Sequence, residues 1–175
     1  MSGLQFTVVA VATVLAFWSV GAYNRLMRLR NGILRGFVPL GQQLELRHAL
    51  LQRQLDALAP VLPEHADALL AVRAACTQAQ AAAVHARSHP GASGALSSLR
   101  LAEDILLETR ARLPPAPSTV ADLADLGTQL AGAEVALQFA RARFNEAVTE
   151  YNQAVQQFPT RMLAGLFGFR AAGTL

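Results

Sequence analysis

The sequence predicts an all-α protein, in which an N-terminal transmembrane helix is followed by an antiparallel up-and-down four-helix bundle. The first 24 residues carry no charged side chain, and residues 4–22 are mostly Val, Ala, Leu and Phe. Beyond them, large apolar residues recur every three or four positions, the pattern of one helix face. No stretch alternates as a strand does. We divide the chain into an anchor (1–24), a four-helix-bundle domain (25–159) and an apolar tail (160–175).

The anchor is long enough to cross a bilayer. Leu4 to Ala22 is nineteen residues, which at 1.5 Å per helical residue span about 30 Å, the thickness of a hydrocarbon core. A cleaved signal peptide is the alternative. The segment has no basic residue before it, and it is longer than the hydrophobic region of a signal peptide, which has ~7–15 residues. We therefore favour a retained, single-pass anchor.

Arginines follow the apolar segment at once and set its predicted orientation. Lys and Arg beside a span favour the cytoplasmic side, so we expect the N-terminus outside and the C-terminal domain in the cytoplasm. Aromatic residues at the same end, Trp18 and Tyr23, fit an interfacial belt. The predicted membrane-interface residues are Trp18, Arg25, Arg28, Arg30 and Arg35.

The charge distribution argues against nucleic acid as a partner. The net charge is 15 − 12 = +3, and without the four arginines at 25–35 it is 11 − 12 = −1. The basic surplus therefore lies beside the predicted membrane, and the domain lacks the basic stripe that a phosphate backbone requires. The single cysteine, Cys76, lies in an Ala-rich helical segment and is expected to be a buried, inert thiol.

The first predicted bundle helix begins directly after the anchor. Its apolar positions run from Leu26 to Leu62 in steps of mostly three or four. Three glycines and Pro39 weaken it, since Gly is a poor helix former and Pro lacks the backbone donor. We therefore expect one break at 36–41 and a second at 60–63, where the sequence is Pro-Val-Leu-Pro.

Two shorter helices are predicted next, over 64–87 and 94–112, separated by a loop at 88–93 that is rich in Pro, Gly and Ser. The second helix is predicted to bury Leu69, Val72, Cys76 and Ala83. The apolar face of the third comprises Leu96, Leu99, Ile105, Leu106 and Leu113.

The fourth helix, predicted over 119–158, has the longest apolar stripe. A Pro-rich segment at 113–118 precedes it, and Thr119 with Asp122 forms an approximate capping box. Pro159 ends it. The stripe comprises Leu123, Leu126, Leu130, Ala133, Leu137, Ala140, Phe144, Val148, Tyr151, Val155 and Phe158. The apolar tail after it, around 162–169, has two interpretations: it packs over the end of the bundle, or it contacts the bilayer or a partner.

Few residues suggest chemistry. His85 and His89 have the i, i+4 spacing of a metal-binding pair, but nearby ligands are missing. Glu45 and His48 form one E-x-x-H string, whereas di-iron bundles use two, and we expect His48 to be a hydrogen-bonded core histidine. Phosphate-binding loops and nucleophile motifs are lacking. We therefore expect no enzymatic activity, no cofactor and no bound metal.

Two blocks of the sequence resemble the LemA family of bacterial membrane proteins. The first is the apolar span followed by Tyr23-Asn24-Arg25, with Arg47-His48 further on. The second and more specific block is C-terminal, with Phe144-Asn145, Tyr151-Asn152, Phe158-Pro159 and Gly168-Phe169. A weaker match lies at 69–75.

The resemblance implies a membrane-anchored helical bundle with no activity or cofactor to carry over, and a location at the bacterial inner membrane. One relative takes part in forming magnetosome membranes, which makes membrane organisation an alternative function. The chain also departs from the family. Phe37 stands where a Trp is usual, 51–55 replaces an Ile-Pro-Asn-Leu stretch, and Glu134-Val135-Ala136 replaces Glu-Asn-Arg.

The motif asparagines are expected to form structural or partner contacts, because Asn is a poor residue for a helix interior. The candidate partner or structural residues are Tyr23, Asn24, Arg47, His48, Phe144, Asn145, Tyr151, Asn152, Phe158 and Pro159. The preferred hypothesis is a scaffold or docking module for an unidentified protein partner. A metal- or small-ligand-binding bundle and a membrane-organising protein are the alternatives. The oligomeric state is left open.

Overall fold

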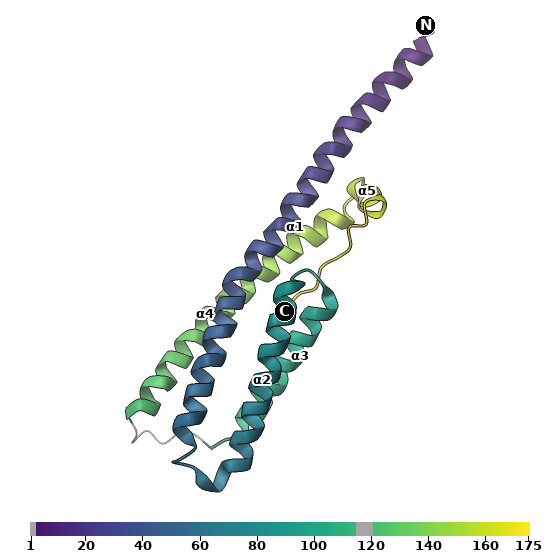
Figure 1. Cartoon of the computed structure of the whole chain (residues 1–175). Helices are drawn as coiled ribbons and strands as arrows, with labels where there is room; N and C mark the ends of the chain where they lie inside the picture. The colour runs from purple at the N-terminus through teal and green to yellow at the C-terminus, as the bar shows by residue number, and fades with distance from the viewer. Residues whose placement is uncertain (1–2, 115–120) are drawn as a thin grey trace.

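A computed structural model describes residues 3–114 and 121–175, and all the regular structure within them is helical (Figure 1). One long apolar helix at the N-terminus extends beyond the rest of the protein, as predicted. The helices are α1 (Gly3–Leu58), the 3₁₀ turn η1 (Pro63–His65), α2 (Ala66–Ser88), α3 (Ser93–Ala111), α4 (Ala121–Gln156) and α5 (Thr160–Leu166).

Helix α1 continues without interruption from the apolar segment through Leu58, so the expected break at 36–41 is wrong. Pro39 lies inside the helix on its exposed side, where the carbonyl left without a donor can face water. Gly36 faces α4, and a Cβ atom built on it would lie 3.7 Å from the Cα atom of Phe144. Packing against α4 on both sides of Pro39 outweighs the local helix-breaking tendency.

The second expected break is confirmed, since α1 ends at Leu58 and η1 begins at Pro63. Helices α2 and α3 also lie close to their predicted ranges, joined by the loop at 89–92. Leu69, Val72 and Cys76 are buried as predicted, whereas Ala83 is only partly buried. The apolar face predicted for α3 is wrong at Ile105, which is 36% exposed, because it lies next to the buried row rather than in it.

Helix α4 buries its predicted stripe from Leu123 to Val155. The exception is Phe158, which is 77% exposed and not part of the helix. The helix ends at Gln156, and the chain turns at Phe158-Pro159 into α5. The predicted Thr119 cap lies outside the described residues.

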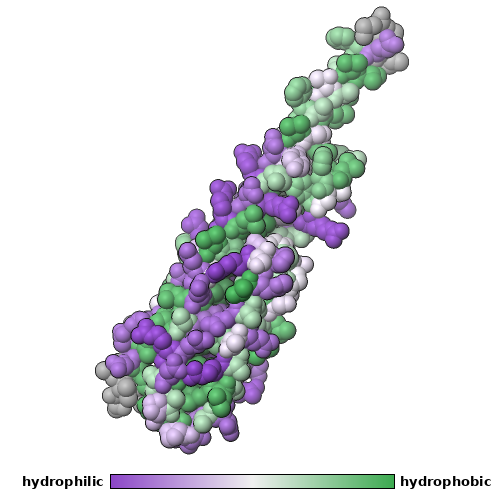
Figure 2. All heavy atoms as spheres, viewed as in Figure 1, coloured by the Kyte–Doolittle hydropathy of each residue, from purple (hydrophilic) through white to green (hydrophobic). Residues whose placement is uncertain are grey.

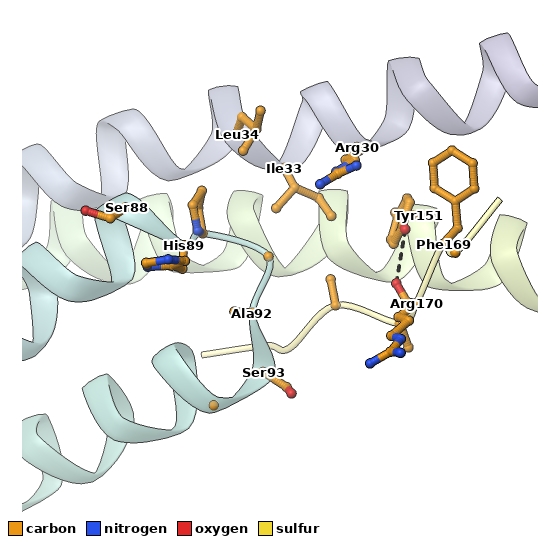
Figure 3. A pocket seen from close by; sticks show the side chains of 16 residues that line it. Arg30, Ile33, Leu34, Ser88, His89, Ala92, Ser93, Tyr151, Phe169 and Arg170 are labelled. Atoms are coloured by element: carbon orange, nitrogen blue, oxygen red, sulfur yellow. Dashed lines mark hydrogen bonds between the residues drawn. The ribbon is translucent and has the colours of Figure 1, made fainter. Parts of the chain in front are cut away.

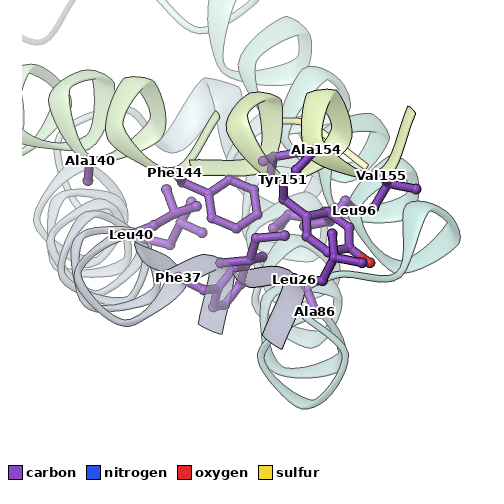
Figure 4. Close-up of a cluster of buried hydrophobic side chains, with 14 of the residues drawn as sticks. Leu26, Phe37, Leu40, Ala86, Leu96, Ala140, Phe144, Tyr151, Ala154 and Val155 are labelled. Atoms are coloured by element: carbon purple, nitrogen blue, oxygen red, sulfur yellow. The ribbon is translucent and has the colours of Figure 1, made fainter. Parts of the chain in front are cut away.

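Two hydrophobic clusters fill the space among α1, α2, α3 and α4, and each takes side chains from all four helices. The cluster nearer the apolar half of α1 includes Phe37 and Phe144, whose rings meet edge-to-face with centroids 5.6 Å apart (Figure 4). The other cluster contains Cys76, whose thiol is buried as predicted. Burial raises the pKa of this thiol, which keeps it protonated and unreactive.

The chain after α5 has no regular secondary structure over 168–175, which we call the C-terminal segment. Gly168 starts it with a φ of 72°, a left-handed conformation that favours glycine. The segment returns along α4 to the start of α3 (Figure 1). Gly173 passes so close to α3 that a Cβ atom there would lie 2.7 Å from the Cα atom of Ser93.

Candidate functional site

A buried ionic cluster joins three helices near the middle of the protein. Glu103 of α3 is 5% exposed and accepts hydrogen bonds from two neighbouring residues of α1. The Arg47 guanidinium donates to one carboxylate oxygen, and His48 Nε2 lies 2.7 Å from the other. Since both oxygens of Glu103 are engaged, α1 and α3 are held in one register.

A second carboxylate extends the cluster to α4. One oxygen of Glu134 lies 3.6 Å from Arg47 and 3.7 Å from Arg110 of α3. The Nε atoms of Arg47 and Arg141 are buried without a hydrogen-bond partner. The positive charge of Arg47 beside His48 favours the neutral form of the imidazole.

The pKa of His48 is lowered to about 4, mainly by burial and also by the positive charge of the neighbouring Arg47. His48 is therefore neutral at pH 7 and donates its Nε2 proton to Glu103. Burial also lowers the pKa of Arg47 from its usual value, while Glu134 opposes this shift. Arg47 remains charged, because the guanidinium is the most basic of the protein side chains.

A second polar site, which we call the clasp, holds the C-terminal segment along α4. The amide of Asn152 donates to the carbonyl of Ala172 at 2.9 Å and accepts from the backbone N–H of the same residue at 2.8 Å. Asn145, two turns earlier, makes the same pair of bonds with Leu175, at 2.5 and 2.9 Å. The Tyr151 hydroxyl donates to the carbonyl of Arg170 at 3.0 Å.

The clasp binds backbone rather than side chains. Each asparagine amide satisfies one N–H and one C=O group, as a neighbouring β-strand does. The contacts also explain why asparagine is present in a helix that otherwise disfavours it. Burial raises the pKa of Tyr151, so its hydroxyl stays protonated as a donor. Asn145 and Asn152 therefore make structural contacts, with the C-terminal segment rather than with another helix, whereas Asn24 is exposed.

A cavity of about 560 Å³ lies between α1, the α2–α3 loop and the C-terminal segment (Figure 3). Its walls include Arg30, His89, Tyr151 and Arg170. The dashed line in Figure 3 is the Tyr151–Arg170 bond of the clasp, so the cavity and the clasp share one wall.

The structure separates the predicted motif residues into three groups. Arg47 and His48 belong to the ionic cluster. Asn145, Tyr151 and Asn152 form the clasp, next to Phe144 in the core. Tyr23 contacts Phe167 and Phe169, and Asn24, Phe158 and Pro159 are exposed. The predicted interface residues Trp18, Arg25, Arg28, Arg30 and Arg35 are all exposed along α1.

The histidines considered as metal ligands lie in two separate places, His85 and His89 on the surface and His48 in the core. His85 and His89 lie side by side on the surface, with ring centroids 5.1 Å apart. Glu45 pairs with Arg87 rather than with His48. In the part of the chain that the structure describes, His, Cys, Asp and Glu side chains form no group of three or more suited to a metal ion.

The partners of Arg47 and His48 were not predicted from the sequence. Glu103 occupies a position on the apolar face of its helix, between Leu99 and Leu106. A charged residue in such a row predicts a buried partner, so this signal was available. The backbone groups that the clasp binds have no comparable signal, because any sequence supplies them.

The family model described as "LemA family" matches residues 49–175. The match includes the clasp, Glu103 and α5, and begins just after Arg47 and His48. No curated protein and no solved structure matches the chain.

Proposed function

The chain belongs to the LemA family, and from this premise we propose that it is a non-enzymatic, membrane-anchored scaffold that docks partner proteins at the bacterial inner membrane. The first part of α1 supports the anchor: this helix is long and apolar enough to cross a membrane. Its side chains from Gln5 to Val20 are almost all exposed, which is costly in water and favourable in lipid. The arginines after it favour a cytoplasmic C-terminal domain.

The arrangement that we propose for the domain is an antiparallel up-and-down four-helix bundle. Successive contacts along α1 meet residues of decreasing number along α4: Phe37 meets Phe144, and Arg47 lies beside Glu134. The short connections at 59–62 and 89–92 are typical of neighbouring helices that reverse direction.

An exposed apolar pair on α4 is the observation on which the docking proposal rests. Val135 and Phe139 are 73% and 65% exposed and lie one turn apart. The guanidinium of Arg143 covers part of the Phe139 ring, 5.6 Å from its centroid. Aromatic and arginine side chains are the types that contribute most to protein interfaces.

The position of this pair favours a protein over lipid as its partner. Phe144 lies against Phe37, which is about 22 Å beyond Ala22 at 1.5 Å per helical residue. Phe139 is farther still along α4, well outside the depth that an interfacial segment reaches.

A photo-crosslinking residue in place of Phe139, in the full chain in its native membrane, tests the proposal. We expect a covalent adduct with one protein species, identified by mass spectrometry and abolished by Val135→Ser. The control is the same crosslinker at Gln138, which is also exposed but is turned about 100° around the helix. Equal adducts at both positions, or adducts with lipid alone, would overturn the docking site.

A further inference from the structure

Helix α5 has one buried face and one apolar face that the protein leaves uncovered. Thr160 and Ala164 are buried one turn apart. Met162 and Leu166, also one turn apart, point outward and are 67% and 81% exposed. Phe158, in the turn before α5, is also 77% exposed. We call Met162 and Leu166 the outer row of α5.

The outer row lies beside the end of the proposed membrane span. Phe167 and Phe169 both meet the Tyr23 ring edge-to-face, with centroids 5.2 and 5.8 Å apart. Tyr23 directly follows the apolar segment that ends at Ala22. Figure 1 shows α5 beside α1 at the end of the domain from which the apolar half of α1 emerges. Figure 2 shows hydrophobic residues along that half of α1 and again at the α5 end.

The charges around α5 suit an anionic lipid surface. Arg161 lies within α5 and Arg170 follows it, and both are exposed. Arg25 and Arg28 are exposed on α1 shortly after Tyr23. No acidic residue occurs between Glu150 and the end of the sequence shown, so nothing acidic in this segment offsets the attraction between these arginines and lipid phosphates.

We infer that α5 lies in the headgroup region of the same bilayer that α1 crosses, with its outer row among the upper acyl chains. An apolar row with arginines beside it is the pattern of an interfacial segment. The membrane can cover the outer row without any second protein, because the contact between Tyr23 and Phe167 already holds α5 beside the end of the proposed span, at the membrane surface. The inference rests on the proposed anchoring of α1.

Tryptophan fluorescence tests the anchoring of α1 and the membrane contact of α5 separately, because Trp18 is the chain's single tryptophan. The full-length protein is placed in vesicles of phosphatidylethanolamine and phosphatidylglycerol that contain lipids brominated either high or low on the acyl chain. The native protein reports on α1. Trp18→Phe combined with Leu166→Trp reports on α5, and Trp18→Phe with Met162→Trp repeats the test on the same face. Trp18→Phe with Leu70→Trp is the control, since Leu70 is exposed on α2.

We expect lipids brominated high on the chain to remove most of the emission at position 166, with a shift to shorter wavelength, and to leave position 70 unchanged. Quenching at position 18 with none at 166 and 162 would overturn the seating of α5 while keeping the anchor. If none of the positions is quenched, the proposed anchoring of α1 is overturned as well. A blue-shifted, unquenched signal at 166 would place a second protein copy on the outer row, and would also overturn the inference.

Discussion

The ionic cluster and the clasp stabilise the same domain through opposite kinds of polar contact. The cluster joins charged side chains of α1, α3 and α4, and Glu103 within it is nearly inaccessible to water. The clasp uses neutral amides and a phenol, and its partners are backbone groups of residues 170–175. Buried charges are costly when one partner is removed, whereas a neutral hydrogen bond contributes modestly. The cluster therefore specifies how helices meet, and the clasp specifies where one segment lies.

The largest effect is expected from Glu103→Leu. This change leaves His48 without its acceptor and Arg47 with only the more distant Glu134, and breaking a buried ion pair costs about 3–5 kcal/mol. The free energy of unfolding of the full chain in detergent, from urea denaturation followed by circular dichroism, measures the loss. Glu108→Leu is the control, because Glu108 pairs with Arg112 on the surface, where such pairs contribute about 1 kcal/mol or less. Equal losses in the two variants would show that the cluster has no special role.

Lowering the pH should weaken the cluster through His48. Its pKa in the folded protein, about 4, lies below the usual value of about 6.5, so between these values the unfolded chain binds more protons. The contribution of neutral His48 to the free energy of unfolding is therefore fully present above pH 6.5, and it falls by a few kcal/mol as the pH drops toward 4. Urea midpoints across this range measure the slope. In His48→Gln, which keeps an amide donor, the part of the slope due to His48 should vanish, and an unchanged slope would contradict the assignment.

A smaller and more local effect is expected from Asn152→Ala, which removes both bonds to Ala172. The two backbone groups left unsatisfied should destabilise the C-terminal segment by about 1–3 kcal/mol. Hydrogen exchange should therefore speed up at residues 170–175 and stay unchanged at the ionic cluster. Gln153→Ala is the matched control, because Gln153 is the next residue of α4 and its side chain is exposed. Faster exchange throughout α4 would mean that the clasp also supports the core.

The smallest effect is expected from Tyr151→Phe. The change removes one hydrogen bond, to the Arg170 carbonyl, and keeps the ring that packs in the core. We expect a loss of about 1 kcal/mol, read as a small shift of the urea midpoint with exchange increased mainly near Arg170. A loss as large as that of Glu103→Leu would erase the distinction between the two sites.

The two regions also differ in how far the sequence predicts them. The burial of His48 and the structural contacts of Asn145 and Asn152 follow from residue types that are unusual for their positions. The acceptor of His48 could have been predicted, since Glu103 interrupts an apolar row. The course of the C-terminal segment could not, because its contacts are with backbone atoms that carry no sequence information.

The fold shows the same division between local and tertiary information. Helix ranges and the buried stripe of α4 follow from apolar spacing, and the helix boundaries at 58–63 from proline. The continuity of α1 through Pro39 does not follow from apolar spacing or from proline, because contacts with Phe144 and its neighbours on α4 decide it. Phe158 illustrates the reverse error: its spacing continues the α4 stripe, but the chain turns away before it and leaves the side chain exposed.

The unbroken course of α1 has a mechanical consequence. From Ala22 to Leu58 the helix extends about 54 Å at 1.5 Å per residue, with no hinge between the proposed lipid-embedded part and the domain. At the typical transmembrane tilt of about 20°, its far end is displaced sideways by about 18 Å. Tilt depends on bilayer thickness, so under the proposed anchoring an unbroken α1 couples local membrane thickness to the lateral position and lean of the whole domain.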